Sequence, residues 1–208
     1  MGPFAFRPDA AASEIHTLGT KLGAALGTLR KVEDVTYGVT EREEIWRDGK
    51  VALYRFRGER PPTAKVPLLI VYALVNRPYM VDLQEDRSIV RNLLSQGEDV
   101  YLIDWGYPDR SDRYVTLDDY INEWIRRCLQ VVARRHRVPK INLLGICQGG
   151  AFSLCYAAIH PQTVQNLVTM VTPVDFHTAD NMLSKWTRAM DVDLLVDTLG
   201  NVPGDLMN

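Results

Sequence analysis

Four short stretches of the chain are apolar at nearly every position, the pattern of parallel strands that are buried on both faces. They cover residues 66–74, 99–105, 141–146 and 166–171. An alternating segment, EEIWRDGKVALYRFR, comes before them, and Asp48-Gly49 within it predicts the turn of an antiparallel hairpin. The pattern therefore predicts six strands, of which the first two form the hairpin.

Helical periodicity fills most of the intervals between these strands. Residues 86–97 predict a helix that Gly97 ends. Thr116 and Asp119 have the spacing of a capping box, and they open a long predicted helix that runs through Arg137. The inward stripe of this helix is expected at Ile121, Trp124, Ile125, Cys128, Val131 and Val132.

Three further segments have helical character. Residues 151–160 predict a helix directly after the third apolar stretch, and the chain beyond residue 172 predicts one or two more. Leucines at helical spacing predict a loose N-terminal helix over residues 10–31. Strands that alternate with helices after one hairpin predict a mostly parallel α/β sheet with helices on both faces.

Composition narrows the class of protein. Of the 208 residues 46% are hydrophobic and 24% are charged, as in an ordinary globular domain, and the net charge of −2 does not favour nucleic acid as a partner. The first residues lack the layout of a secretory signal, and the apolar runs are too short to span a membrane. The three cysteines are an odd number in helix- or turn-like contexts, which fits a reducing cytoplasm better than a disulfide framework. No Cys/His spacing resembles a zinc site. We expect Cys128 and Cys155 in the core.

The sequence GICQGG, residues 145–150, places Cys147 between a predicted buried strand and a helix of small residues. A nucleophile on such a sharp strand-to-helix turn stands clear of the sheet. Gly145 and Gly149 are the small residues that this turn requires two positions before and after the nucleophile, and Gly150 gives further room. The helix that begins near Gln148 directs its dipole at the thiol, so we expect the thiolate to be favoured. Cys147 is therefore the candidate nucleophile, and the alternative is a buried structural cysteine at a tight junction.

Two backbone amides are candidates for stabilising an oxyanion. One is the N–H of Gln148, which directly follows the nucleophile. The other follows the third strand, where Val75 or Asn76 is the expected donor. Asp104 and Trp105 end a strand at the same edge, and they either shape a pocket or tie neighbouring loops together.

A cysteine nucleophile needs a base, and the base needs an orienting carboxylate. In folds with this turn, the acid and the histidine follow later strands, and no further pair of buried strands is predicted here. We therefore expect the chain to end before its own acid and histidine. His177, beside Asp175, is the one internal candidate for a base, with an ordinary polar loop residue as the alternative. His160 is expected at the far end of the helix after Cys147, and His16 and His136 at the surface.

The box GICQGG resembles the G-x-C-x-G-G box of polyhydroxyalkanoate synthases. Other segments resemble the class III catalytic subunit in the same order over about residues 66–205: PLLIVYALVNRPYMVDLQEDRS, DVYLIDWGYPDRSDR, VTLDDYI and NLVTMVTPVDF. The resemblance implies an α/β-hydrolase core, here without its last strands. It also implies a polymerase that joins (R)-3-hydroxyacyl groups, chiefly 3-hydroxybutyryl, and releases coenzyme A through a cysteine thioester.

The resemblance also implies site residues, organisation and partners. Cys147 matches the family nucleophile, and Val75 and Gln148 match the oxyanion amides. The family's catalytic Asp and His lie beyond this chain, which alone is expected to be inactive. The expected parts are a helical arm (1–40), a partial core (41–179) and the start of a cap (180–208). No metal or cofactor is expected, because the coenzyme A thioester is the substrate. The expected partners are a second synthase subunit, a second copy in a homodimer and the polymer granule in the cytoplasm.

Two other functions stay open. A cysteine-dependent hydrolase of the dienelactone-hydrolase type also uses G-x-C-x-G, although Gly150 and the segment VNRPYMVDLQEDRS argue against it. A non-catalytic α/β binding module would explain the missing acid and histidine. Whatever the function, the strand at residues 166–171 would normally be covered by later strands, and without them it is expected to be an uncovered apolar edge that favours self-association.

Overall fold

The computed structural model describes residues 17–21, 37–178 and 181–201. Contacts divide the chain into two units, Met1–Thr36 and Tyr37–Asn208. In the first unit residues 17–21 are helical, and the rest of the helix predicted over residues 10–31 lies outside the described residues. The second unit holds the sheet, its covering helices and the turn that carries Cys147.

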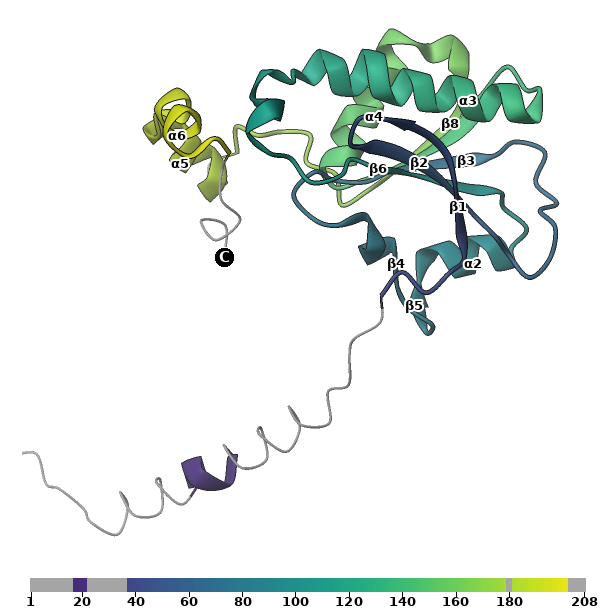
Figure 1. Cartoon of the computed structure of the whole chain (residues 1–208), viewed down its shortest axis with the longest axis horizontal. Helices are drawn as coiled ribbons and strands as arrows, with labels where there is room; N and C mark the ends of the chain where they lie inside the picture. The colour runs from purple at the N-terminus through teal and green to yellow at the C-terminus, as the bar shows by residue number, and fades with distance from the viewer. Residues whose placement is uncertain (1–16, 22–36, 179–180, 202–208) are drawn as a thin grey trace, which may run out of the picture. The chain divides into compact units, whose positions relative to one another are not determined.

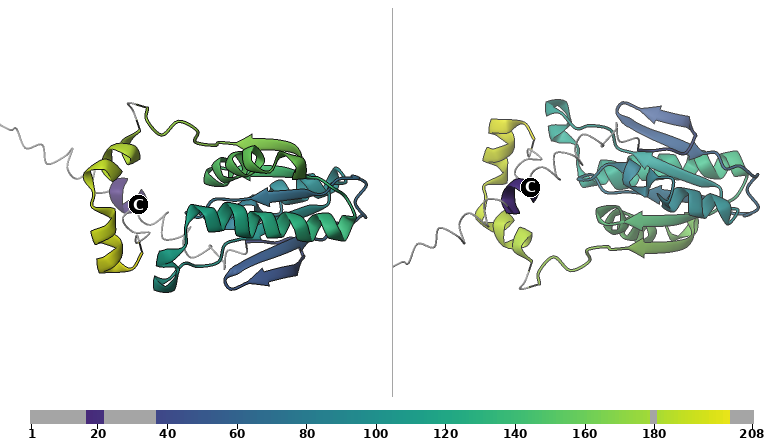
Figure 2. Two further views of the ribbon diagram at one scale, coloured as in Figure 1. Left: turned by 90° about the horizontal axis from the view of Figure 1, so that it is seen from above. Right: turned by 90° about the horizontal axis from the view of Figure 1, so that it is seen from below.

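A six-stranded sheet forms the centre of the second unit (Figure 1). Its spatial order is β1-β2-β6-β3-β7-β8, in which β1 pairs with β2 and β2 with β6 in antiparallel fashion. The four strands from β6 to β8 are parallel, as the apolar stretches predict. Figure 2 shows the β1–β2 hairpin and β8 at opposite sides of the sheet. The strands are β1 (Arg42–Asp48), β2 (Val51–Phe56), β3 (Leu68–Val71), β6 (Val100–Asp104), β7 (Ile141–Ile146) and β8 (Val164–Met170).

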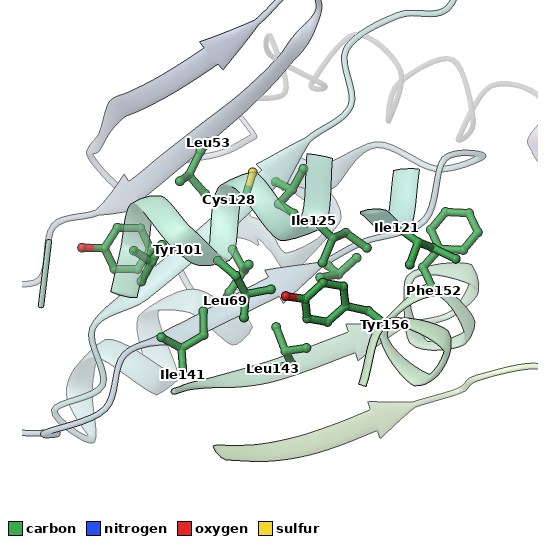
Figure 3. Packing of buried hydrophobic residues seen from close by; sticks show 14 of the residues in the cluster. Leu53, Leu69, Tyr101, Ile121, Ile125, Cys128, Ile141, Leu143, Phe152 and Tyr156 are labelled. Atoms are coloured by element: carbon green, nitrogen blue, oxygen red, sulfur yellow. The ribbon is translucent and has the colours of Figure 1, made fainter. Parts of the chain in front are cut away.

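Two apolar clusters cover the two faces of this sheet. On one face the sheet packs against the long helix and the helix after Cys147 (Figure 3). On the other face it packs against Val90 of the short helix α2 (Ile89–Ser95). Neighbouring residues of β3 divide between the clusters, with Leu69 in the first and Ile70 in the second, because successive strand residues face opposite sides. The fold is therefore the predicted α/β fold with helices on both faces.

The segment before α2 differs from the prediction. A small hairpin of β4 (Asp82–Gln84) and β5 (Arg87–Ser88) takes up the start of the predicted helix over residues 86–97. The buried carboxylate of Asp82 explains the difference, since it accepts hydrogen bonds from Thr40 and from the Ser88 hydroxyl. This long-range contact holds Ser88 in extended backbone, where its side chain also caps α2. The helix ends near Gly97 as predicted, and that residue has a φ of 86°.

The long predicted helix is present but begins differently. Thr116 and Asp119 make the reciprocal hydrogen bonds of a capping box. A π-helical stretch (Asp119–Ile125) comes next and then continues as α3 (Arg126–His136), which ends where Arg137 adopts a φ of 53°. Ile121, Ile125, Cys128 and Val132 of the predicted stripe are buried, while Trp124 and Val131 are only partly buried and Leu129 joins the core.

The last described segments are more exposed than the core. β8 was expected to be a buried strand, but most of its residues are exposed because it is an edge strand with a neighbour on one side only. The helices α5 (Met182–Ala189) and α6 (Val192–Leu199) come after it, as the looser pattern beyond residue 172 predicts. An ion pair between Arg113 and Asp197 joins α6 to the loop after β6. In the described part of the chain, no helix combines the length and the apolar character that crossing a membrane requires.

Candidate active site

Cys147 lies on the sharp turn between β7 and α4 (Gln148–Ile159). Its backbone has φ 54° and ψ −125°, a conformation that costs free energy in a residue with a side chain. Its own N–H donates to the carbonyl of Met170 at the end of β8, at 2.9 Å. The turn is thus held in a strained geometry by the sheet on one side and the helix on the other.

The three glycines around Cys147 allow chain segments to come close together. A Cβ added to Gly145 would lie 2.5 Å from the Cα of Gly150, and a Cβ at Gly149 would lie 2.7 Å from the carbonyl oxygen of Tyr72. A Cβ at Gly150 would lie 2.7 Å from the Cγ2 of Thr172. These distances are shorter than real Cβ contacts, so each glycine is required for packing rather than for a positive φ.

The loop that follows β3 lies against this turn. The backbone N–H of Leu74 donates to the side-chain Oε1 of Gln148 at 3.1 Å. The next residue, Val75, has a side chain that is 69% exposed. Among the hydrogen bonds of the described residues, the N–H groups of Val75 and Gln148 have no acceptor. The amides named from the sequence therefore lie on two segments that a hydrogen bond joins, and their role in stabilising an oxyanion stays a prediction.

No histidine of the described part of the chain is hydrogen-bonded to Cys147. The exposed His177 makes one hydrogen bond within the described residues, from its backbone N–H to Asp175 Oδ1 at 2.8 Å, which is a turn contact. His160 caps the far end of α4, as predicted, and its Nε2 lies 2.9 Å from Asn122 Oδ1. The candidate base His177 thus stays a prediction.

His136 differs from its prediction as a surface residue. Its ring is partly buried, with Nε2 2.8 Å from the Tyr101 hydroxyl and 3.4 Å from Asp99 Oδ2. Burial lowers the pKa of His136, and the positive charges of Arg55 and Arg135 act in the same direction against Asp99. The sequence pattern missed this because the ring is covered through contacts with β6. His16 lies outside the described residues.

The other two cysteines have different environments. Cys128 is fully buried, as predicted, and burial raises the pKa of its thiol. Cys155 is exposed, which makes its placement in the core wrong. The reason is that α4 packs on the sheet through Phe152 and Tyr156, so that Leu154 and Cys155 face outward.

A cavity of about 360 Å³ opens where β3 and β6 end. Its lining includes Leu74 from the loop after β3 and the aromatic side chains of Trp105, Tyr120 and Trp124. The Trp105 Nε1–H donates to the carbonyl of Tyr72 at 2.9 Å. Asp104 accepts from the N–H of Gly106, so it shapes a turn, while Trp105 both lines the cavity and ties two loops.

Metal ligands and cofactors were not expected from the sequence. Within the described residues, no group of three or more His, Cys, Asp or Glu side chains is arranged to hold a metal ion. The expectation that the reaction uses no metal or cofactor stays a prediction.

Comparison with known proteins supports the resemblance. The chain is 56% identical to the poly(3-hydroxyalkanoate) polymerase subunit PhaC of Allochromatium vinosum, over 100% of this chain and 59% of that protein. It is 51% identical to the protein of the same name from Synechocystis, over 85% of this chain and 48% of that protein. The resemblance to polyhydroxyalkanoate synthases is thereby confirmed, and the chain spans less than two thirds of the length of these relatives.

Two solved structures share the fold at low sequence identity. The Francisella virulence factor BioJ superposes with a TM-score of 0.53 at 12% identity, over 76% of this chain and 52% of that one. The mature lipase of Bacillus licheniformis gives a TM-score of 0.50 at 19% identity, over 76% of this chain and 60% of that one. The family model described as the alpha/beta hydrolase fold matches residues 66–203. The order of the strands, the turn that carries Cys147 and this match together show that the chain belongs to the alpha/beta hydrolase fold family.

Proposed function

We propose that Cys147 is the nucleophile of an acyltransferase that polymerises (R)-3-hydroxyacyl groups from their coenzyme A thioesters. The observation that carries this proposal is the strained backbone of Cys147 at the N-terminus of α4. The N–H of Gln148 directly follows it, and the loop that carries Val75 is joined to the Gln148 side chain through the N–H of Leu74. The names of relatives such as the Allochromatium vinosum polymerase subunit support the same activity.

In the first step the Cys147 thiolate attacks the carbonyl carbon of the thioester. A new C–S bond forms to Cys147, and the C–S bond to coenzyme A breaks. Coenzyme A leaves as a thiolate and takes up the proton that Cys147 has lost. The negative charge on the carbonyl oxygen in the tetrahedral intermediate is stabilised by the N–H groups of Gln148 and Val75.

In the second step the hydroxyl of another acyl unit attacks the enzyme thioester. An ester C–O bond forms, the C–S bond to Cys147 breaks, and the hydroxyl proton passes to a base. A thioester at Cys147 suits this step because it stays more activated toward a hydroxyl than a serine ester does. A cysteine nucleophile therefore favours transfer to a growing polyester chain over plain hydrolysis.

The cavity beside the loop after β3 is the proposed place for the acyl chain. Trp105, Tyr120 and Trp124 give it an aromatic lining, which suits the short alkyl groups of a 3-hydroxybutyryl unit. Lys50 and Asp112, which form an ion pair, are among its lining residues. The thioester itself supplies the activated group, so no further cofactor is part of the proposal.

The partners belong to the same proposal. The resemblance to class III synthases favours a second synthase subunit and a homodimer at the surface of polymer granules in the cytoplasm. As the resemblance implies, we place the catalytic acid and base in the whole protein, of which this chain would be a part. Each of these is a proposal for the whole protein rather than for these residues alone.

The test uses a full-length protein that carries this sequence. The decrease in thioester absorbance measures the release of coenzyme A from 3-hydroxybutyryl-CoA. The amount of polymer formed is measured in the same reaction. Cys147→Ala should abolish both, while Cys155→Ala, at an exposed cysteine of the same helix, should leave both unchanged. Normal release by Cys147→Ala would show that another group is the nucleophile.

A further inference from the structure

We propose that the side chain of Gln148 is a positioning residue that holds the loop after β3 in the geometry of an oxyanion hole. This inference rests on the proposed function and assigns the Gln148 side chain a role apart from that of its backbone N–H. It starts from the hydrogen bond that Gln148 Oε1 accepts from the N–H of Leu74, at 3.1 Å.

The bond lies one residue before the proposed oxyanion donor. Val75 directly follows Leu74, so fixing the peptide group of the Leu74 N–H leaves only the φ and ψ angles of Leu74 between it and the Val75 N–H. Among the described residues, this is the one hydrogen bond made by the backbone of residues 74–76. The side chains of Val75 and Asn76 are both exposed, so they make no buried packing contact that could replace this hydrogen bond.

The two ends of the loop are held separately. At its start the carbonyl of Tyr72 accepts from Trp105 Nε1 at 2.9 Å. At its end Arg77 Nη1 donates to the carbonyl of Gly106 at 3.1 Å. Both of these ties lead to the loop after β6, whereas the Gln148 bond leads to the nucleophile turn. Among the described residues, the Gln148 bond is therefore the one hydrogen bond that joins the middle of the loop to the turn at Cys147.

The chemistry of glutamine suits this role. Its backbone N–H is one proposed oxyanion donor, and its side chain holds the loop that carries the other, so one residue couples both donors. The amide Oε1 accepts a hydrogen bond as a carboxylate does, but it carries no negative charge that would oppose the developing oxyanion. Preorganised donors stabilise such charge because they need no rearrangement during the reaction.

The experiment compares two reactions of Cys147 in the full-length protein. Acylation by 3-hydroxybutyryl-CoA needs the oxyanion hole, whereas alkylation by iodoacetamide does not form an oxyanion. Gln148→Met keeps the length of the side chain and removes the acceptor. We expect its rate of acylation in a single turnover to fall about tenfold or more, since loss of one oxyanion donor costs roughly a hundred- to a thousandfold. The rate of alkylation should stay within about twofold of wild type, because the thiol keeps its place at the start of α4.

Two further variants complete the design. Gln148→Asn keeps the amide but is one methylene shorter, so it should lose acylation to a similar degree even if Gln148→Met folds poorly. Gln130→Met, at an exposed glutamine of α3, is the matched control and should leave both rates unchanged. Unchanged acylation in the two Gln148 variants, or an equal fall of acylation and alkylation, would overturn the inference. Failure of the wild-type protein to be acylated at Cys147 would instead overturn the proposed function.

Discussion

Gly149 in α4 lies so close to Tyr72 that a Cβ at this position would be 2.7 Å from the Tyr72 carbonyl oxygen. The same Cβ would be 2.6 Å from the carbonyl carbon of Val71, so backbone atoms on two residues block it. Gly149→Ala should therefore force α4 away from β3 and lower the free energy of unfolding by about 1–3 kcal/mol. Urea denaturation measures this change, and the rate of Cys147 alkylation should change with it.

The matched control is Gly19→Ala, in the helical residues 17–21. A Cβ at Gly19 would meet no atom within 4 Å, and the substitution removes a residue that weakens helices. Its midpoint in urea should equal or exceed that of wild type. Equal midpoints for Gly149→Ala and wild type would show that α4 adjusts to the added methyl group without cost.

The three cysteines should react with iodoacetamide in a defined order near neutral pH. Cys147 should react fastest, because its partly buried sulfur lies at the N-terminus of α4, where the backbone N–H groups of the helix attract negative charge. Cys155 is exposed without a comparable helix end, so it should react more slowly. Cys128 should not react in the folded protein, since burial raises the pKa of its thiol and blocks access.

Mass spectrometry of peptides from a labelling time course measures all three rates in one sample. Cys155 serves as the internal reference for an exposed thiol on the same helix. Labelling of Cys147 no faster than Cys155 would mean that the turn does not activate the sulfur.

His136 should make the stability of the fold depend on pH. Burial is the largest cause that lowers its pKa below the ordinary 6.5, so the unfolded chain binds a proton more readily than the folded protein. The free energy of unfolding should therefore fall as the pH falls through 6.5 toward the lowered pKa. His136→Gln should reduce this dependence, as measured by urea denaturation between about pH 5 and pH 7.5.

The exposed His177 is the control for this experiment. His177→Gln should keep the pH dependence of wild type, because its ring has no hydrogen-bond partner within residues 37–178 and 181–201. A wild-type stability that stays flat over this pH range would contradict the lowered pKa of His136.

β8 should promote self-association of the 208-residue chain. It forms one edge of the sheet, and Val168 and Met170 on it are 53% and 39% exposed. An exposed apolar edge offers unpaired backbone groups to another chain, and a charged side chain on it opposes such pairing. Val168→Lys should shift the sedimentation profile toward the monomer. Thr169→Lys adds the same charge at the neighbouring position of β8 without removing an apolar side chain, so it tests whether the charge alone has this effect. A wild-type chain that sediments as a monomer at high concentration would refute the prediction.

Local pattern was sufficient for the order and type of the main elements. The apolar stretches predicted β3, β6 and β7, and Asp48-Gly49 predicted the β1–β2 hairpin. The short β4–β5 hairpin was not predictable in this way. It depends on the buried carboxylate of Asp82, whose hydrogen bond with Thr40 joins residues 42 positions apart.

In the candidate site, too, local features were predictable from the sequence and long-range contacts were not. Cys147 and its glycines could be named from spacing alone, because the strand-to-helix turn requires residues without side chains at fixed positions. The hydrogen bond between Gln148 and Leu74 could not, since the partners are 74 residues apart and a backbone amide has no sequence signal. Conversely, Cys155 and His136 were misplaced because helical periodicity does not say which face of a helix another segment covers.

The amino-acid sequence by itself determined the mostly parallel α/β architecture, the position of the candidate nucleophile and the close packing around it, because these depend on short-range periodicity and on the space that glycine leaves. Only the tertiary structure decided which loop meets the turn at Cys147, which cysteine faces outward and how the Gln148 side chain is used. Those features depend on contacts between residues far apart in the chain, and their energies are set by burial and hydrogen bonding in the folded molecule.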